Sequence, residues 1–149
     1  MKVHEIMSTN PHYLNADSTL RDAAMMMREC NCGMLPIASP DNQDKLMGII
    51  TDHDMVVRGL AEGLGADQKA ATCMTDRVLY CLRDDDVAEV ARNMDSQHVQ
   101  RLIVLDDRQS KRFCGVISLS DIAAASSTDH SLQGAISECS RPYQHSAMH

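Results

Sequence analysis

The sequence predicts an α+β fold built from two copies of one supersecondary unit. Shifting the chain by 67 positions aligns residues 7–55 with residues 74–122 without a gap, and nine of the aligned residues are identical. Each copy shows the apolar spacing of a helix, then two short apolar runs around a polar turn, then a second helical segment. A repeat of this length implies a pseudo-twofold pair of small sheets packed by helices, with a cleft between the copies.

The repeat also divides the chain of 149 residues into segments. We expect a first repeat over residues 1–64, a linker over 65–71, a second repeat over 72–126 and a C-terminal tail over 127–149. Within the tail, residues 131–138 are expected to form a short helix, and residues 140–149 are expected to be loose.

Capping residues and an apolar stripe predict the first long helix of each repeat. Thr19 and Asp86 each precede a carboxylate by three residues, and of Asp22 and Glu89 only Glu89 has the usual side chain of a capping box. Apolar residues at helical spacing then face a sheet, namely Leu20, Ala23, Ala24 and Met27 in the first copy and Val87, Val90, Ala91 and Met94 in the second.

Two apolar runs follow each helix and are typical of a β-hairpin. They cover Met34–Ala38 and Leu46–Thr51 in the first copy, and Leu102–Leu105 and Phe113–Ser118 in the second. The second helices are expected over Asp52–Leu64 and Leu119–Ala125. A short strand is expected before each long helix, near Tyr13 and near Tyr80.

Composition restricts the classes of function. A formal net charge of −7 argues against nucleic acid or an anionic membrane surface as partner, and no apolar run approaches the ~20 residues of a membrane span. Most of the six cysteines stand where the pattern needs a small apolar residue, so we expect reduced core thiols and a cytoplasmic protein. The sequence contains no recognisable catalytic motif, which predicts that the chain is not an enzyme.

The best-matched repeated segment is Gly-x-x-Thr/Ser-x-x-Asp, at Gly48–Asp54 and at Gly115–Asp121. Each copy is a strand that ends in a hydroxyl, followed three residues later by an aspartate at a helix N-terminus. The helix N-terminus and the hydroxyl suit a phosphate, and the aspartate can accept from two ribose hydroxyls. For one copy alone the simpler interpretation is an N-cap with an ordinary first-turn acid. Duplication of the pattern in one cleft favours a ligand site.

With this motif and the segments Gly33–Ile37 and Val99–Val104, the chain resembles a tandem pair of cystathionine-β-synthase (CBS) domains, a Bateman module, over roughly residues 1–126. The run Gly48–Gly59 is similar to that of short bacterial stand-alone CBS-pair proteins. The resemblance implies a regulatory module that binds an adenosine compound such as AMP, ADP or ATP between the repeats, without a cofactor or a metal. The regulated protein is not identified by the sequence. Because one pair of repeats leaves a helical face for a second pair, we also expect a homodimer through the helices near Leu20–Met27 and Val87–Met94.

The resemblance assigns a ligand set to each cleft. In the second cleft, which we favour, the set is Asp121 for the ribose hydroxyls, Ser118 and Ser120 for phosphate, Arg101 for positive charge, and Val78, Leu79, Tyr80, Gln100 and Leu102. In the first cleft it is Asp54, Thr51, His53, Asn10, His12, Tyr13, Gly33, Met34 and Pro36. Gln100 and His53 replace cations of the family pattern, so tight binding of a triphosphate is not expected.

Two other functions stay open from the residues alone. Cys30 and Cys32 with His12 or His53 could form a redox or metal sensor, although Cys-x-Cys is not the usual zinc spacing. The repeats could also be a structural dimerisation module whose clefts bind no ligand. A zinc assay with thiol counting separates the sensor from nucleotide sensing.

Overall fold

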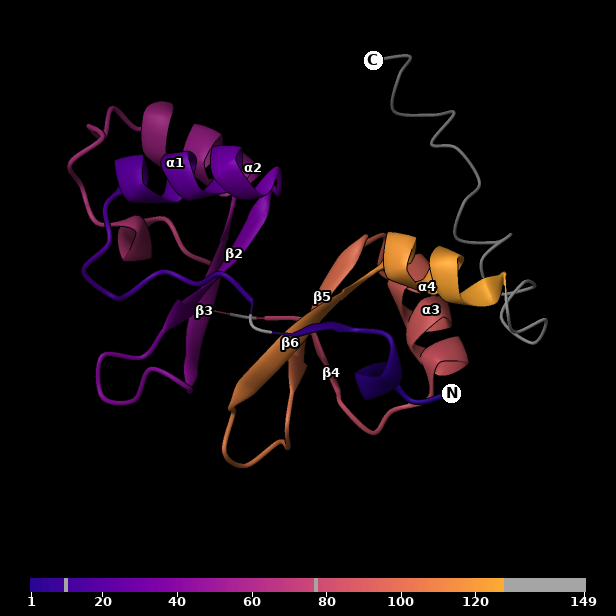
Figure 1. Ribbon diagram of the computed structural model, residues 1–149. Coiled ribbons are helices and arrows are strands. Elements are labelled where there is room, and N and C mark those ends of the chain that lie inside the picture. The colour runs from indigo at the N-terminus through magenta and orange to yellow at the C-terminus, as the bar shows by residue number, and fades with distance from the viewer. Residues whose placement is uncertain (10, 77, 128–149) are drawn as a thin grey trace, which may run out of the picture.

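The computed structural model describes residues 1–9, 11–76 and 78–127, which form two lobes (Figure 1). The first lobe contains α1 (Leu20–Cys30), β2 (Met34–Ala38), β3 (Leu46–Thr51), α2 (Asp52–Asp54) and the π-helical segment η2 (Met55–Leu60). The second contains β4 (Tyr80–Leu82), α3 (Val87–Ser96), β5 (Arg101–Leu105), β6 (Phe113–Ser118) and α4 (Leu119–Ser126). Three short segments complete the described elements, namely η1 (Val3–Glu5), β1 (Ser8–Thr9) and η3 (Ala70–Thr72). The predicted α+β class is confirmed.

Both lobes share one strand order, as the repeat predicts. The second lobe has the order β1-β6-β5-β4, in which only the β4–β5 pairing is parallel. In the first lobe β2 and β3 form the antiparallel hairpin, and single bridges replace the outer strands, Thr75 with Ile49 and Leu14 with Ile37. The strand expected near Tyr80 is confirmed. The strand expected near Tyr13 is wrong, because the chain there makes only the Leu14 bridge before it turns away.

The caps of the long helices differ from the expectation in one respect. At α1, Thr19 Oγ1 accepts the Asp22 N–H at 3.1 Å, and the Thr19 N–H donates to the Asp22 carboxylate at 2.9 Å. At α3, Asp86 accepts the Ala88 N–H, and no capping box forms with Glu89. The capping box expected from Asp86 and Glu89 is therefore wrong. The N-terminal residues occupy this helix end instead, where the Val87 N–H donates to the Met1 carbonyl at 3.0 Å.

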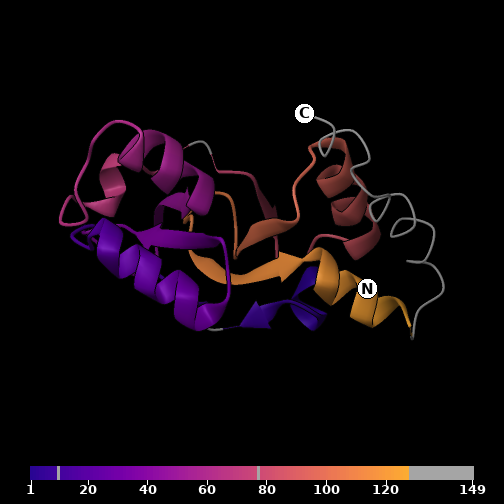
Figure 2. The ribbon, with the colours of Figure 1, turned by 90° about the horizontal axis from the view of Figure 1, so that it is seen from above.

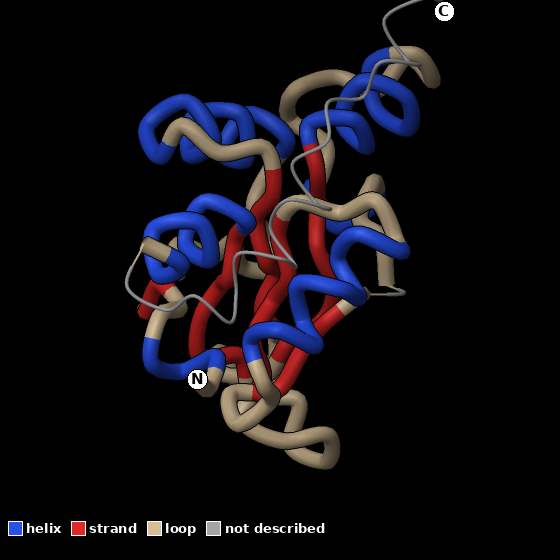
Figure 3. Tube along the Cα trace, turned by 90° about the vertical axis from the view of Figure 1, so that its right-hand side faces the viewer, coloured by secondary structure: helices blue, strands red, loops and turns tan. Residues whose placement is uncertain are grey.

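The helices lie outside the strands, as Figure 3 shows, and bury unequal apolar stripes. All four stripe residues of α3 are at most 2% exposed. In α1 the residues Leu20, Ala23 and Met27 are buried, but Ala24 is exposed, so the expected burial of Ala24 is wrong. The second helical stretch of the first lobe ends at Leu60 rather than Leu64. None of the helices in the described residues has the length and apolar character to cross a membrane.

The segment that leads into each repeat packs into the opposite lobe. Val3 is fully buried in the core of the second lobe, and the N-terminus lies beside α3 (Figure 1). Figure 2 shows the indigo N-terminal segment running along the orange strand β6. Conversely, Ala70 and Cys73, which precede the second repeat's strands, are fully buried in the core of the first lobe. The expected bounds of the repeats, 1–64 and 72–126, stay a prediction. In space, each lobe contains the leading segment of the other repeat.

Two equivalent glycines allow this exchange. A Cβ on Gly115 would lie 2.6 Å from the carbonyl oxygen of Ser8, and a Cβ on Gly48 would lie 2.8 Å from that of Thr75. Both contacts are with backbone, which cannot move aside as a flexible side chain could. The glycine of the repeated motif therefore stands where the other segment crosses the hairpin.

The cysteines of the described residues are all free thiols. Cys73 and Cys81 are buried, which confirms the core expectation for them, whereas Cys30, Cys32 and Cys114 are half-buried. Burial raises the pKa of Cys81 to about 12 and the pKa of Cys114 to about 11. Cys139, the helix expected over residues 131–138 and the loose end expected over 140–149 lie outside the described residues.

The crossing at Gly115 can be tested by adding one methyl group. Gly115→Ala should lower the free energy of unfolding by about 1–3 kcal/mol, because the Cβ would overlap the Ser8 backbone. The control is Gly65→Ala, whose Cβ would meet nothing within 4 Å; its effect should stay within about 0.5 kcal/mol. Urea unfolding of both variants measures the difference. Equal midpoints would show that the crossing carries no constraint.

The raised thiol pKa values predict slow labelling of Cys81 and Cys114 by Ellman's reagent at pH 8. The thiolate is the reactive form, and a pKa near 12 or 11 leaves very little of it at that pH. Mass spectrometry of quenched samples should find both residues unlabelled in the folded protein and labelled after unfolding in guanidinium. Labelling of Cys81 at the same rate in both states would contradict its burial.

Candidate functional site

The end of β3 and the start of α2 place a hydroxyl and a carboxylate in one hydrogen-bonded unit. Thr51 Oγ1 accepts the Asp54 N–H at 3.0 Å, and the Thr51 N–H donates to Asp54 Oδ2 at 3.0 Å. Thr75 belongs to the segment that leads into the second repeat and crosses β3 at Ile49, which we call the crossing segment. The Thr75 hydroxyl donates to the same carboxylate at 3.3–3.4 Å. Asp54 is only 7% exposed and is the one buried charged residue among the described residues.

The second copy repeats this unit, with the difference that its hydroxyl also donates to the carboxylate. The Ser118 N–H and hydroxyl both donate to Asp121 Oδ2 at 2.9 Å, and Ser118 Oγ accepts the Asp121 N–H at 3.1 Å. Asp121 is half-buried. Both aspartates are thus first-turn residues of a capping box, which is the simpler interpretation of the motif. This role leaves them able to accept further hydrogen bonds, because a carboxylate has about four lone-pair sites.

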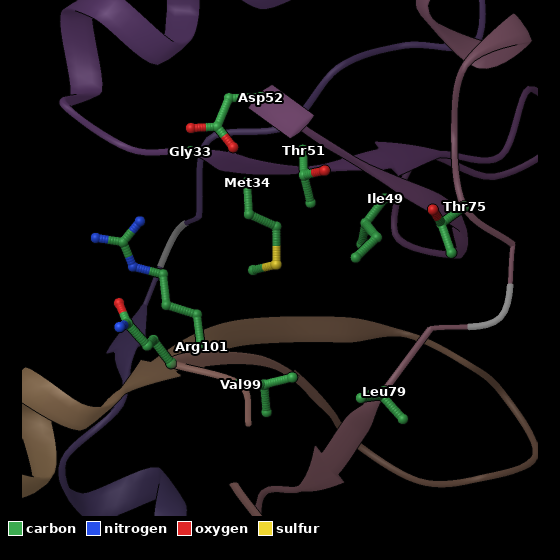
Figure 4. A pocket seen from close by; sticks show the side chains of 10 residues that line it. Gly33, Met34, Ile49, Thr51, Asp52, Thr75, Leu79, Val99 and Arg101 are labelled. Carbon is green, nitrogen blue, oxygen red and sulfur yellow. The ribbon is translucent and has the colours of Figure 1, made fainter. Parts of the chain in front are cut away.

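A pocket of about 550 Å³ opens between the repeats (Figure 4). Asp54 is not among its lining residues, but its hydrogen-bond partners Thr51 and Thr75 are. We call this pocket the Thr51 pocket; it is lined by Gly33, Met34, Ile49, Thr51, Asp52, Thr75, Leu79, Val99, Gln100 and Arg101. Its walls come from β2, β3, the crossing segment and the start of β5. The volume lies in the range of small-molecule sites, and the lining combines apolar side chains with a few polar groups.

Six of the predicted site residues line this pocket, namely Gly33, Met34, Thr51, Leu79, Gln100 and Arg101. Ser118, Ser120 and Asp121 are not among its lining residues. Leu79, Gln100 and Arg101 were assigned to the second cleft by the resemblance, and here they face Thr51 instead. His53 is exposed, and its N–H donates to Asp52 Oδ1 at 2.8 Å.

The structure does not bring every predicted segment to the cleft that the resemblance assigned to it. Val78 and Tyr80 were expected beside Asp121, but they line a small cavity of about 120 Å³ that Leu46 of the first lobe also lines. Tyr13 was expected in the first cleft, but its ring packs edge-on against Phe113 of the second lobe, with centroids 5.6 Å apart. The leading segments cross to the other repeat only at Ser8–Thr9, which pair with β6, and at Thr75, which bridges Ile49. Farther along, Leu14 and β4 pair with the hairpins of their own repeats.

Burial corrects two further expectations. Pro36, predicted for the first cleft, is less than 2% exposed, and Leu102, predicted for the second, is 6% exposed within the second core, so neither side chain presents a broad surface to a ligand. His12 is exposed and does not line the pocket. Asn10 lies outside the described residues.

Sequence reasoning missed four residues that line the pocket, Ile49, Asp52, Thr75 and Val99. Asp52 stands inside the quoted motif, but at a position where the second copy has Leu119, so the repeat comparison gave it no weight. Thr75 aligns with Ser8, and this pair of hydroxyl residues is the one signal that could have found it.

The residues suspected of metal binding form no cluster in the part of the chain described here. Among residues 1–9, 11–76 and 78–127, no group of three or more His, Cys, Asp or Glu side chains is arranged to hold a metal ion. Cys30 and Cys32 are free thiols at the end of α1. The redox or metal sensor therefore stays an untested alternative.

Comparison with known proteins agrees with this architecture. The sequence profile of the CBS domain matches twice, over residues 3–59 and 70–128. The uncharacterized protein YlbB of Bacillus subtilis is 29% identical over 139 residues, covering 93% of this chain and 91% of YlbB. Hypoxic response protein 1 of Mycobacterium tuberculosis is 32% identical over 120 residues, which is 80% of either chain.

Solved structures show the same fold. A crystal structure of Hypoxic Response Protein I with two coordinated zinc ions has a TM-score of 0.71 and 30% identity, and the match covers 83% of this chain and 98% of that one. The CBS domain pair of protein MJ0100, in complex with 5′-methylthioadenosine and S-adenosyl-L-methionine, has a TM-score of 0.71 and 26% identity over 86% and 97% of the two chains. With the profile matched in tandem and the strand order repeated in both lobes, this chain belongs to the CBS domain family as a pair of CBS domains.

Proposed function

We propose that this CBS pair is a regulatory module that senses an adenosine compound bound in the Thr51 pocket. The observation that carries the proposal is the pocket itself, whose walls come from both repeats. Met34 and Ile49 on one side, and Leu79 and Val99 on the other, provide apolar surfaces for a flat heterocycle (Figure 4). The complex of the related MJ0100 pair with two adenosine compounds supports the ligand class.

Asp54 is the proposed acceptor for the ribose. Its carboxylate lies beneath Thr51 and Thr75, both of which line the pocket. The Thr75 hydroxyl reaches it only at 3.3–3.4 Å, which is longer than a usual O–H···O hydrogen bond. A ribose hydroxyl that took this place would form a shorter, charge-assisted bond. The set around Ser118, Ser120 and Asp121 stays a prediction for the opposite cleft.

Binding would signal by changing how the lobes are held. Beyond the pocket, the two hairpin tips are joined: the Leu46 N–H donates to the Lys111 carbonyl at 3.0 Å, and Arg112 pairs with Asp44 at 3.7 Å. A ligand that contacts both walls would favour one lobe angle about these joined tips. A partner that distinguishes the lobe angles would read the signal, and the free thiols support a reducing cytoplasm as the setting.

Matched substitutions of the two aspartates test the site. Asp54→Asn should weaken binding of adenosine or AMP, measured by calorimetry, by roughly tenfold to hundredfold, which is the loss of about 1.5–3 kcal/mol for a charge-assisted bond. Asp121→Asn alters the equivalent capping box and should leave this affinity nearly unchanged. Thermal melts control for the shared loss of capping. A larger loss in Asp121→Asn would move the ligand to the opposite cleft, and no binding of any adenosine compound at millimolar concentration would refute sensing.

We also propose a homodimer, formed through the exposed face of α1 and η2. Exposed apolar side chains gather there, including Met25 (43%), Val56 (56%) and Leu60 (74%). The ion pair of Arg21 with Asp67 borders them. An apolar centre with a polar rim is the usual anatomy of a protein interface. The α3 part of the expected interface has less support, because its exposed residues Glu89, Arg92 and Asn93 are polar.

Light scattering tests this interface. The chain at micromolar concentration should show twice the mass of a monomer, and Val56→Glu should reduce it to the monomer because a buried charge in the interface lacks a partner. Ala123→Glu places the same charge at the equivalent exposed position of α4 and should leave the dimer intact. A monomeric wild-type chain would refute the dimer, and dissociation by Ala123→Glu alone would place the interface on the second lobe.

A further inference from the structure

Cys30 and Cys32 stand on either side of the turn that ends α1. Asn31 between them has a left-handed backbone with a φ of 50°, and the Cys32 N–H donates to the Met27 carbonyl at 3.1 Å. This compact turn brings the two thiols within hydrogen-bonding reach of each other. Both side chains are half-buried, and Cys32 packs against the edge of the first core. A small solute can therefore reach the pair without the core opening.

The second repeat has the same turn without the cysteines. His98 is the equivalent of Asn31 and has a φ of 55°. The Val99 N–H again donates to the carbonyl five residues before it, at 3.0 Å. Gln97 and Val99 stand where the first repeat has its two cysteines. The turn therefore forms without thiols, and the pair in the first repeat is not a requirement of the fold.

We propose that Cys30 and Cys32 form an oxidative modification site, at which a peroxide converts the two thiols into an intramolecular disulfide. The thiols are neighbours in the reduced protein, so the bond closes by a local change of the turn and needs no movement of the lobes. Disulfides that form transiently in a reducing compartment are typical of redox sensing. The proposal does not depend on the adenosine site, because it needs only the turn and an oxidant.

The surroundings of the two thiols assign them different roles. Burial and the neighbouring Cys32 thiol raise the pKa of Cys30, so Cys30 carries little thiolate at neutral pH. Because the thiolate is the form that attacks an oxidant, Cys32 attacks first and Cys30 closes the disulfide. The other cysteines of the described residues are poorer targets: Cys73 and Cys81 are buried, and burial raises the pKa of Cys114 to about 11.

The oxidation takes place in two steps. The Cys32 thiolate attacks one oxygen of hydrogen peroxide, the O–O bond breaks, and Cys32 becomes a sulfenic acid while the leaving hydroxide takes up a proton to give water. The Cys30 sulfur then attacks the Cys32 sulfur, the S–O bond breaks, and the hydroxyl leaves with the Cys30 proton as a second water. The two thiols thus lose two electrons, which reduce one peroxide to two waters.

The disulfide would alter the adjoining wall of the Thr51 pocket. Gly33 follows Cys32 and lines that pocket beside Asp52 (Figure 4). The Gly33 carbonyl accepts the Asp52 N–H at 2.9 Å. A Cβ on Gly33 would lie only 2.9 Å from Asp52 Oδ2, so the two residues are already in close contact. A change of the turn at Cys32 therefore reaches the start of α2.

Peptide mapping by mass spectrometry tests the site. Trypsin releases both thiols in the peptide of residues 29–45, which contains no other cysteine. After brief exposure of the folded chain to hydrogen peroxide, this peptide should lack two hydrogens and resist alkylation, and dithiothreitol should restore both thiols. The pair should oxidise roughly tenfold faster than Cys114, the control thiol in the same sample. Thiols that stay open to alkylation, or a disulfide from either one to another cysteine, would overturn the proposal.

Single substitutions test the order of attack. In Cys30→Ser the sulfenic acid on Cys32 has no partner thiol and should be trapped by dimedone. In Cys32→Ser the remaining thiol should stay largely unlabelled. Equal dimedone labelling of the two variants would overturn the assigned order.

Amide NMR spectra of the reduced and oxidised chains test the link to the pocket. Oxidation should shift the amide resonance of Asp52. Leu119 is the matched control, because it is the equivalent residue of the second repeat and its N–H donates in the same way to the Gln100 carbonyl at 3.0 Å. Its resonance should keep its position. An unchanged Asp52 resonance in the oxidised chain would overturn the link.

Discussion

The structure depends on the close crossing of each leading segment over the hairpin of the other repeat. At Gly48 and Gly115 the crossing backbone passes where a Cβ would stand. This close contact has two effects. It fixes the register of the crossing segment against the hairpin, and it attaches each lobe to the leading segment of the other repeat. Val3 in the second core and Cys73 in the first are anchors of this arrangement. Neither lobe can therefore leave the pair without opening both cores.

This crossing also assembles the candidate site. Thr75 reaches Asp54 because its segment bridges Ile49 of β3, with backbone hydrogen bonds of 2.7 and 2.9 Å. The same segment continues to Leu79, which forms part of the pocket wall. Hydroxyl, carboxylate and apolar wall thus come from positions that are distant in sequence but joined by one sheet pairing. Any movement of the lobes changes the site, which is a property that a sensing module requires.

Local sequence patterns predicted most helices and strands. They did not predict which distant segments pair with each other. The hairpin runs, the Thr19 cap and the buried stripe of α3 follow from periodicity and capping chemistry, which act within a few residues. The cleft that each leading segment lines depends on whether the segment packs on its own hairpin or crosses to that of the other repeat. An alignment of the two repeats is the same in both cases and therefore cannot distinguish them. The exposure of Ala24 could not be seen for a similar reason, since its stripe position does not reveal how far the sheet extends beneath it.

The two clefts differ chemically because equivalent residues of the two repeats differ. Some of these positions lie near the pseudo-twofold axis and contribute to both clefts, whereas others contribute to one cleft only. Met34 and Arg101 are equivalent by the repeat, yet both line the Thr51 pocket, so they lie near the pseudo-twofold axis. A change at such a position alters the surroundings of both clefts. Asp52 and its counterpart Leu119 lie away from the axis, and only Asp52 lines this pocket. Divergence at that position gives one cleft a carboxylate without imposing it on the other. A duplicated scaffold can in this way keep one architecture while its two sites acquire different ligand preferences.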